Sequence, residues 1–324
     1  MTLRLTCACG SYDRTLALQF GAISPPGITL DYIALPPEQT FLRQLRDKEF
    51  DVSEMSLSAY VTARAKGESD FLALPIFPSR IFRHSAIYVN SRAGIAKPQD
   101  LRGRRVGVGF YQMTAAVWVR GLLKDEYGLD AADVIWVNGP GTAARGPSAS
   151  AVDQLSNLVA GTAHAKPPLE AMLEAGEIDA LVSVHLPKAI LSGAGTVRRL
   201  FEDYRQEEEA YFRRTGIFPI MHTLVLRRSV HEANPWAAKS LFAAFAAAKR
   251  QAEERLYDTN ALAVTLPSLI PEIERCRALM GDDFWLYGIA SNRRVLETFV
   301  RYLREQDIIA RTVDPADLFI ACDE

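Results

Sequence analysis

The sequence predicts an α/β protein of two lobes with a ligand cleft between them. Its 324 residues suit two domains, because a domain usually spans roughly 100–200 residues. Strands followed by short loops and then helices recur along the chain, a pattern typical of parallel sheets with crossover helices. Two strands, His84–Asn90 and Met221–Arg227, stand where the chain would leave one lobe and later return to it. They place residues 1–88 and 222–324 in the first lobe and residues 89–221 in the second.

The predicted elements fall into two sets and a helical C-terminal part. The first set comprises strands at Leu3–Cys9, Thr29–Leu35, Phe50–Met55 and Phe71–Ile76, and helices at Arg14–Phe20, Glu38–Lys48 and Leu57–Lys66. The second set comprises strands at Arg105–Gly109, Val134–Val137 and Asp179–Val184, and a helix at Thr114–Tyr127. Apolar residues at helical spacing predict two C-terminal helices, Trp236–Tyr257 and Asn292–Gln306. The stretch 139–165 is rich in Gly, Ala, Ser and Pro, which favours a long excursion or lid.

Composition and charge exclude several classes of partner. Hydrophobic residues make up 48% of the chain and charged residues 23%, and the net charge is −2. This balance gives no broad attraction to nucleic acid or to an anionic membrane. A membrane span needs about 18 consecutive apolar residues, and a signal peptide needs ~7–15 of them behind a basic start; the sequence shows neither pattern. We therefore expect a cytoplasmic protein, and its assembly into a homo-oligomer stays open.

Cysteines and glycines give no motif for a cofactor. The four cysteines, Cys7, Cys9, Cys276 and Cys322, are scattered without metal-site spacing and are interpreted as small buried thiols. The glycine pair Gly107-x-Gly109 follows a predicted strand but lacks the third glycine of a dinucleotide loop.

Three polar junctions follow predicted strands, where open α/β sheets bind ligands. They are Ser11–Thr15, Glu54–Ser58 and Phe110–Thr114. A helix start offers unpaired N–H groups that suit a carboxylate. Helix capping is an equal explanation for Ser56 and Thr114, but capping does not explain the remaining polar side chains of these junctions, Arg14, Tyr111 and Gln112.

Arginine and histidine mark the two crossing strands. Arg80 and Arg83 precede the first strand, and the planar fork of an arginine can pair with a carboxylate through two hydrogen bonds. His84 and His222 stand at or near the start of each crossing strand. A structural histidine is the alternative for each alone, but we expect both strands to approach one cleft. The two histidines are therefore candidates for proton transfer.

Four long segments resemble a known family: FDVSEMSLSAY, PIFPSRIFRHSAIYVN, VGFYQMTAAVWVRGLL and TGIFPIMHTLVLRRSV. They are similar to the 4,5-dihydroxyphthalate decarboxylase family, which has the type II periplasmic-binding-protein fold. The resemblance covers nearly the whole chain, including the CGSYDRT start and the GEIDAL segment. The sequence departs from the pattern in the stretch 139–165 and at Asp283–Gly288, where relatives more often have Trp-Pro-Tyr-Gly.

The resemblance implies non-oxidative decarboxylation of a hydroxylated aromatic acid in aromatic catabolism, here phthalate degradation, without a redox cofactor. His84 and His222 would serve as acid and base in an order left open, with Glu54 and Asp13 orienting them or accepting from the ring hydroxyls. Arg14 and Arg80 would bind the retained carboxylate. The remaining substrate contacts would come from helix starts and the second lobe, at Thr15, Ser56, Tyr111, Gln112 and Thr114.

Two alternatives stay open at this point. A divalent metal ion held by His84, His222 and Glu54 could grip the two ring oxygens, although no compact spacing supports it. The protein could also be a cytosolic or exported solute-binding protein for a small aromatic carboxylate, because the fold alone proves no chemistry.

Overall fold

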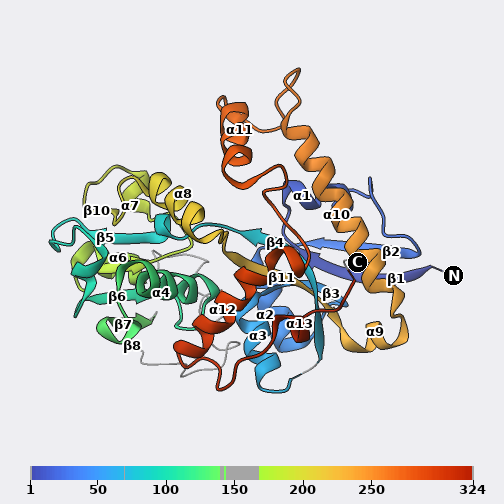
Figure 1. Ribbon diagram of the computed structural model, residues 1–324, viewed down its shortest axis with the longest axis horizontal. Helices are drawn as coiled ribbons and strands as arrows, with labels where there is room; N and C mark the ends of the chain where they lie inside the picture. Colours follow the sequence, from blue (N-terminus) through green and yellow to red (C-terminus); the bar gives the residue numbers. More distant parts are fainter. Residues whose placement is uncertain (1, 69, 139–141, 144–167, 323–324) are drawn as a thin grey trace. The chain divides into compact units, whose positions relative to one another are not determined.

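The computed structural model describes residues 2–68, 70–138, 142–143 and 168–322 (Figure 1). The chain forms two compact units. Unit 1 consists of Met1–Arg80, His222–Leu296 and Val313–Glu324, and unit 2 consists of Ile81–Met221 and Glu297–Thr312. Each unit is built around its own mixed sheet.

The units differ from the predicted lobes in two places. The first crossing comes at Arg80, where strand β4 (Phe71–Arg80) ends, and residues 84–86 form a 3-10 helix in unit 2 instead of the start of a strand. The segment Glu297–Thr312, predicted with the first lobe, belongs to unit 2. The reason is packing, because the C-terminal part of helix α12 (Arg293–Glu305) lies against helix α4 (Thr114–Tyr127).

Unit 1 contains a five-stranded sheet in the order β2-β1-β3-β11-β4. Its strands other than β4 are β1 (Leu3–Cys9), β2 (Ile28–Ala34), β3 (Val52–Ser56) and β11 (Ile220–Arg227). Its helices are α1 (Asp13–Gln19), α2 (Pro37–Asp47), α3 (Leu57–Ala65), α9 (Arg228–Ala233), α10 (Trp236–Leu256), α11 (Leu269–Met280), α13 (Pro315–Leu318) and a 3-10 turn at Ala290–Asn292.

The strand order of unit 1 creates a switch point beside β1. Strands β2 and β3 both run parallel to β1, on its two sides. The chain therefore moves from β1 to β2 in one direction and from β2 to β3 in the other. Right-handed crossovers then put α1 and α2 on opposite faces of the sheet. The carboxyl ends of β1 and β3 flank the crevice where such sheets bind ligands.

Strand β3 is buried along nearly its whole length, as expected for a strand covered on both faces. It carries Glu54, which is 0% exposed. Strand β11 runs antiparallel to β3 and begins at the carboxyl end of that strand, so that His222 lies opposite Ser56. A buried carboxylate and a histidine thus come to the same edge of the sheet.

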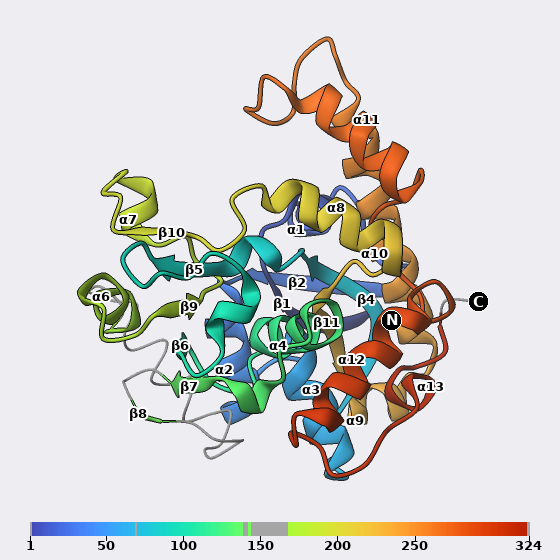
Figure 2. The same ribbon diagram turned by 60° about the vertical axis from the view of Figure 1, so that its left-hand side comes forward.

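Unit 2 contains a six-stranded sheet in the order β10-β5-β9-β6-β7-β8 (Figure 2). Its strands are β5 (Ile87–Asn90), β6 (Arg105–Val108), β7 (Ile135–Asn138), β8 (Thr142–Ala143), β9 (Ala180–Val182) and β10 (Val197–Arg199). Its helices are α4 (Thr114–Tyr127), α6 (Pro168–Ala175), α7 (Lys188–Leu191), α8 (Tyr204–Thr215), most of α12 (Arg293–Glu305), and 3-10 turns at His84–Ala86, Pro98–Leu101 and Ala131–Asp133. Strands β7 and β9 run parallel to β6 on its two sides, which makes a second switch point.

Helix α4 is the buried helix of unit 2. A Cβ atom on Gly121 would lie 2.1 Å from the ring of Tyr302, so this position of α4 needs glycine for α12 to pack closely. The rings of Trp118 and Phe299 stack at 5.2 Å in the same contact. Within the described ranges, no helix is long and apolar enough to cross a membrane. Of the predicted excursion 139–165, only β8 is described, and the rest lies outside the described residues.

Candidate functional site

The Glu54 carboxylate is the centre of a hydrogen-bond network at the carboxyl edge of the unit 1 sheet. Its Oε2 accepts from the backbone N–H of Gly10 at 3.1 Å. The hydroxyl of Tyr12 donates to both carboxylate oxygens, at 2.9 and 3.1 Å. The thiol of Cys9 donates to Oε2 at 3.5 Å. Because a buried carboxylate is costly without such partners, this network explains how Glu54 is accommodated in the core.

The His222 ring completes the network. Its Nδ1 lies 2.5 Å from Oε1 of Glu54, and its side chain is 18% exposed. The ring of Phe41 meets it edge-on at 4.8 Å. Since Glu54 can only accept when it is ionised, it holds the proton of the neutral ring on Nδ1 and leaves Nε2 to exchange a proton with a ligand.

Electrostatics keeps Glu54 ionised and its neighbours neutral. Burial alone would raise the pKa of Glu54, but the charge of His222 and the hydrogen bonds from His222, Gly10 and Tyr12 hold it below its ordinary value. Burial, followed by the Glu54 charge, raises the pKa of the Tyr12 phenol and of the Cys9 thiol. Tyr12 and Cys9 therefore act as neutral donors at this carboxylate.

The turn between β1 and α1 shapes the network locally. A Cβ on Gly10 would lie 2.4 Å from the Tyr12 ring, so glycine is required where that ring folds back. The hydroxyl of Thr15 donates to the carbonyl of Gly10 at 3.0 Å and accepts from the N–H of Tyr12 at 3.1 Å. Thr15 is 0% exposed. Thr15 thus holds the turn through these two hydrogen bonds, and its role in substrate binding stays a prediction.

Ser56 and Asp13 lie at the edges of the network. Ser56 stands opposite His222 in the strand pair and caps α3, because its hydroxyl accepts from the N–H of Ala59 at 3.4 Å. Asp13 is the first residue of α1, with a side chain 51% exposed, and its Oδ1 pairs with Arg14 Nη1 at 3.0 Å. Both remain candidates for contact with a ligand.

Arg14 is engaged inside unit 1. Its Nε donates to the carbonyl of Pro78 at 2.7 Å, and its Nη2 donates to the same carbonyl. The guanidinium carbon lies 4.4 Å from the Tyr12 ring centre and 4.3 Å from that of Trp285. Arg14 therefore ties the Tyr12 turn to β4 and to the segment Asp283–Gly288, where the sequence departs from its relatives.

Arg80 holds the same C-terminal segment. Its Nη1 donates to the carbonyl of Leu286 at 2.9 Å and to Oδ1 of Asn292 at 2.8 Å. The residue is 6% exposed, and burial lowers its pKa to about 10 against the opposing charge of Asp283. These contacts give Arg80 a part in holding the C-terminal segment, and its role as the carboxylate anchor stays a prediction.

We expect Arg80→Met to lower the free energy of unfolding by about 2 kcal/mol, since it leaves a buried acceptor on Asn292 without its charged donor. Urea unfolding measures this loss. Arg4→Met is the control, because Arg4 pairs with Asp31 on the surface and such pairs contribute about 0–1 kcal/mol. Weaker substrate binding with unchanged stability would support the predicted anchor.

His84 is enclosed in unit 2. It is 1% exposed, and its ring meets those of Phe201 and Tyr211 edge-on at 5.3 and 5.2 Å. Neither ring nitrogen has a hydrogen-bond partner among the described residues. Burial, followed by the charge of Arg214, lowers the pKa of His84 to about 4. The two predicted histidines thus belong to different units, with His222 beside Glu54 in unit 1 and His84 in an aromatic cluster of unit 2.

This environment predicts a pH dependence of stability. The unfolded chain protonates His84 below its ordinary pKa of about 6.5, whereas the folded chain does so only near pH 4. Stability due to the neutral ring is therefore complete above pH 6.5 and is lost as the pH falls towards 4. Between pH 7.5 and 5 we expect the His84→Phe variant to lose about 2 kcal/mol less than the parent protein. Urea unfolding at both pH values tests this, with the exposed His185→Asn as control; equal losses in parent and His84→Phe would contradict it.

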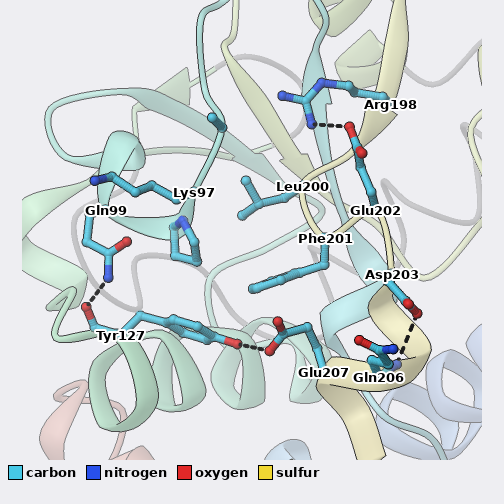
Figure 3. A pocket seen from close by; sticks show the side chains of 12 residues that line it. Lys97, Gln99, Tyr127, Arg198, Leu200, Phe201, Glu202, Asp203, Gln206 and Glu207 are labelled. Carbon is cyan, nitrogen blue, oxygen red and sulfur yellow. Dashed lines mark hydrogen bonds and ion pairs between the residues drawn. The ribbon is translucent and has the colours of Figure 1, made fainter. Parts of the chain in front are cut away.

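A cavity of about 530 Å³ opens in unit 2 (Figure 3). Tyr127 and Phe201 line it, and Tyr127 shares a hydrogen bond of 3.2 Å with Glu207. Its charged lining combines two basic with three acidic side chains, namely Lys97, Arg198, Glu202, Asp203 and Glu207. This mixture does not single out an anionic ligand.

The remaining predicted binding residues, Tyr111, Gln112 and Thr114, follow β6 in unit 2. Tyr111 is 7% exposed, and Thr114 begins α4 and is 4% exposed. Of the residues of the alternative metal set, Glu54 and His222 lie together in unit 1, and His84 lies in the aromatic cluster of unit 2. Among the described residues, no group of three or more His, Cys, Asp or Glu side chains is placed to hold a metal ion.

Tyr12, Phe41 and Trp285 are site neighbours that the sequence reasoning did not select. Tyr12 had a usable signal, because it stands in the polar junction after β1. Phe41 contacts His222 from a helix, and Trp285 contacts Arg14 from a C-terminal loop. No local sequence pattern predicts either contact.

Comparison with known proteins places this geometry in a family. Residues 26–180 match the model described as ABC transporter, phosphonate, periplasmic substrate-binding protein. The chain is 38% identical to the 4,5-dihydroxyphthalate decarboxylase of Comamonas testosteroni over 98% of this chain and 96% of that protein. It is 36% identical to the 4,5-dihydroxyphthalate decarboxylase of Pseudomonas putida over 65% of this chain and 82% of that protein.

Solved structures agree on the fold. The periplasmic aliphatic sulphonate binding protein SsuA of Escherichia coli superposes with a TM-score of 0.56 at 16% identity, over 98% of both chains. The fold is therefore the periplasmic-binding-protein fold, as the sequence predicted. The sequence identity to the Comamonas protein along almost the entire length decides the family within this fold. The chain belongs to the 4,5-dihydroxyphthalate decarboxylase family.

Proposed function

We propose that the protein removes one carboxyl group from 4,5-dihydroxyphthalate to give 3,4-dihydroxybenzoate and carbon dioxide, with His222 as the group that transfers the proton. Membership of the decarboxylase family along 98% of the chain supports the reaction and the substrate class. The observation that carries the role of His222 is its 2.5 Å contact with the buried Glu54 carboxylate.

The chemistry requires one proton on a ring carbon and no change of oxidation state. A hydroxyl para to the leaving carboxylate donates electron density as the ring carbon that bears this carboxylate takes up a proton. The bond to the carboxyl carbon then breaks, carbon dioxide leaves, and the aromatic ring is restored. The protein must supply an acid for the carbon and an acceptor for the hydroxyl.

His222 Nε2 suits this task. With Nδ1 held by Glu54, Nε2 can accept the hydroxyl proton or deliver a proton to the ring carbon. Glu54 is already occupied by His222, Gly10, Tyr12 and Cys9. It therefore acts as a positioning residue that fixes the ring and stabilises its charged form, and the substrate proton is left to His222.

A direct assay tests the proposal. The protein is incubated with 4,5-dihydroxyphthalate carrying labelled carboxyl groups, and labelled carbon dioxide and 3,4-dihydroxybenzoate are measured together. Equal amounts of the two products are expected. The same assay after treatment with a chelator tests the metal-assisted alternative, in which activity falls and returns with a divalent ion. Saturable binding without either product would instead identify a binding protein.

A further inference from the structure

Unit 2 buries a positive charge that the proposed chemistry does not use. Arg120 lies on α4 in the apolar run Val117–Leu123 and is 1% exposed. Burial lowers its pKa to about 10, only partly opposed by Tyr111, so the side chain remains a cation near neutral pH. A charged residue in the centre of a buried helix needs a specific reason.

The contacts of Arg120 do not neutralise it. Its Nε donates to Oε1 of Gln306 at 2.7 Å, and its Nη2 donates to the carbonyl of Tyr111 at 2.5 Å. The guanidinium lies over the Tyr111 ring at 3.8 Å and near the Trp136 ring at 5.2 Å. Its Nη1 is buried and has no hydrogen-bond partner in the part of the chain that the structure describes. Across the described part of the chain, no carboxylate forms an ion pair with Arg120, although a buried cation is ordinarily paired.

The position of this charge points to a ligand. Side chains of a helix lean towards its N-terminus, and Arg120 accordingly reaches Tyr111 in the turn between β6 and α4. That turn lies at the carboxyl edge of the sheet, beside the second switch point. Asn138 pairs with Val108 at the same edge and is 8% exposed, and its Oδ1 has no hydrogen-bond partner among the described residues. Within the described part of unit 2, two buried polar groups at one ligand-binding edge thus lack partners.

We propose that Arg120 is the positive charge of an anion subsite in unit 2, which takes the carboxylate of an aromatic acid beside Tyr111. The identification of the ligand as an aromatic acid rests on the proposed function. Arg120 holds both the carbonyl and the ring of Tyr111, so charge and aromatic surface are presented together. The carboxylate of the ligand would serve as the counter-ion of Arg120.

The test uses phthalate, which has both carboxylates but no ring hydroxyl to assist decarboxylation, and catechol, which is neutral. Their dissociation constants are measured by calorimetry on the full-length protein. A hydrogen bond to a charged group corresponds to about ten- to a hundredfold in affinity. Arg120→Met should weaken phthalate binding by that factor and leave catechol binding unchanged. Arg120→Lys should restore part of the affinity, because it keeps the charge but not the fork.

A second variant separates charge from packing. Gln306→Glu keeps an acceptor for Nε of Arg120 and makes it a carboxylate, and it removes the hydrogen bond that Nε2 of Gln306 donates to the carbonyl of Val117 at 3.0 Å. The new carboxylate should pair with Arg120 and weaken phthalate binding about tenfold, the value of one hydrogen bond to a charged group. Catechol binding should not change, because catechol is neutral. The matched control is Arg83→Met, which removes another buried arginine of unit 2, 7% exposed, and should leave both dissociation constants unchanged.

Two results would overturn the subsite: parental phthalate affinity in Gln306→Glu, or equal losses for phthalate and catechol in Arg120→Met. The second would reduce Arg120 to a packing role. If Arg120→Met does not fold, Gln306→Glu decides alone. Failure of the proposed reaction is distinguishable, because it appears as missing product in the parent protein, whereas failure of the subsite appears only in the phthalate measurements.

Discussion

His222→Asn should lower turnover of 4,5-dihydroxyphthalate by about 10²–10⁴, the usual loss when a general acid or base is removed. The asparagine amide can still donate to Glu54, so the network and the fold should persist. It cannot exchange a proton with the ring carbon. Substrate affinity should therefore change by no more than a fewfold, and stopped-flow measurement of single-turnover product formation should locate the loss in the chemical step.

Two other histidines serve as comparisons for this result. His231→Asn, on α9 of the same unit, should turn over normally. His84→Asn tests the other histidine that the sequence predicts for proton transfer. Because the ring of His84 is enclosed, this variant should also turn over normally. Near-normal turnover by His222→Asn would contradict the assigned role, and a loss confined to His84→Asn would return proton transfer to the other unit.

Glu54→Gln should also lower turnover by about 10²–10⁴, by a different route. Replacing the carboxylate behind a catalytic histidine by an amide costs about 10⁴ in serine proteases, because the ring takes the wrong tautomer. Here the amide can donate to Nδ1 of His222 and shift the ring proton to Nε2. Nitrogen-15 NMR of labelled histidine reads that tautomer directly, which an effect of packing alone would not change.

Glu253→Gln is the matched control for this variant. Glu253 is a partly buried glutamate of unit 1 that lies 3.3 Å from Lys249, outside the network of Glu54. Its substitution should leave both turnover and the His222 spectrum unchanged. A Glu54→Gln protein with parental turnover would show that the short contact to His222 has no part in the reaction.

Much of the fold could be predicted because local patterns and topology agree. Strand Leu3–Cys9 and helix Thr114–Tyr127 have the predicted bounds, and each coincides with a clear change of composition. The strand start at His84 was wrong, since the chain there turns through a 3-10 helix before β5. The positions of Pro and Gly do not predict this turn, and the aromatic rings that pack around His84 come from distant parts of the chain.

The sequence could predict site residues only where the pairing of strands determines their positions. Glu54 and His222 follow from two strands whose ends meet at one edge, and the structure brings these residues together. The role of Arg14 and Arg80 in carboxylate binding stays a prediction, and their contacts with Trp285, Leu286 and Asn292 could not be foreseen. These partners lie more than 200 positions away, beyond the reach of local patterns. Arg120 had a signal that was not used, a charge within an apolar helical run.

The return of α12 to unit 2 has a consequence for synthesis on the ribosome. Helix α4 emerges long before the residues that cover it, among them Phe299, Tyr302 and Gln306. Until then Trp118 lacks its stacking partner and the Arg120 charge lacks the acceptor of Gln306. Helix α4 therefore stays partly exposed until almost the entire chain has been synthesised. Intermediates with such exposed apolar surface are prone to aggregate. A stop codon shortly before α12 would thus yield insoluble protein, although every residue of the Glu54 network would already have been made.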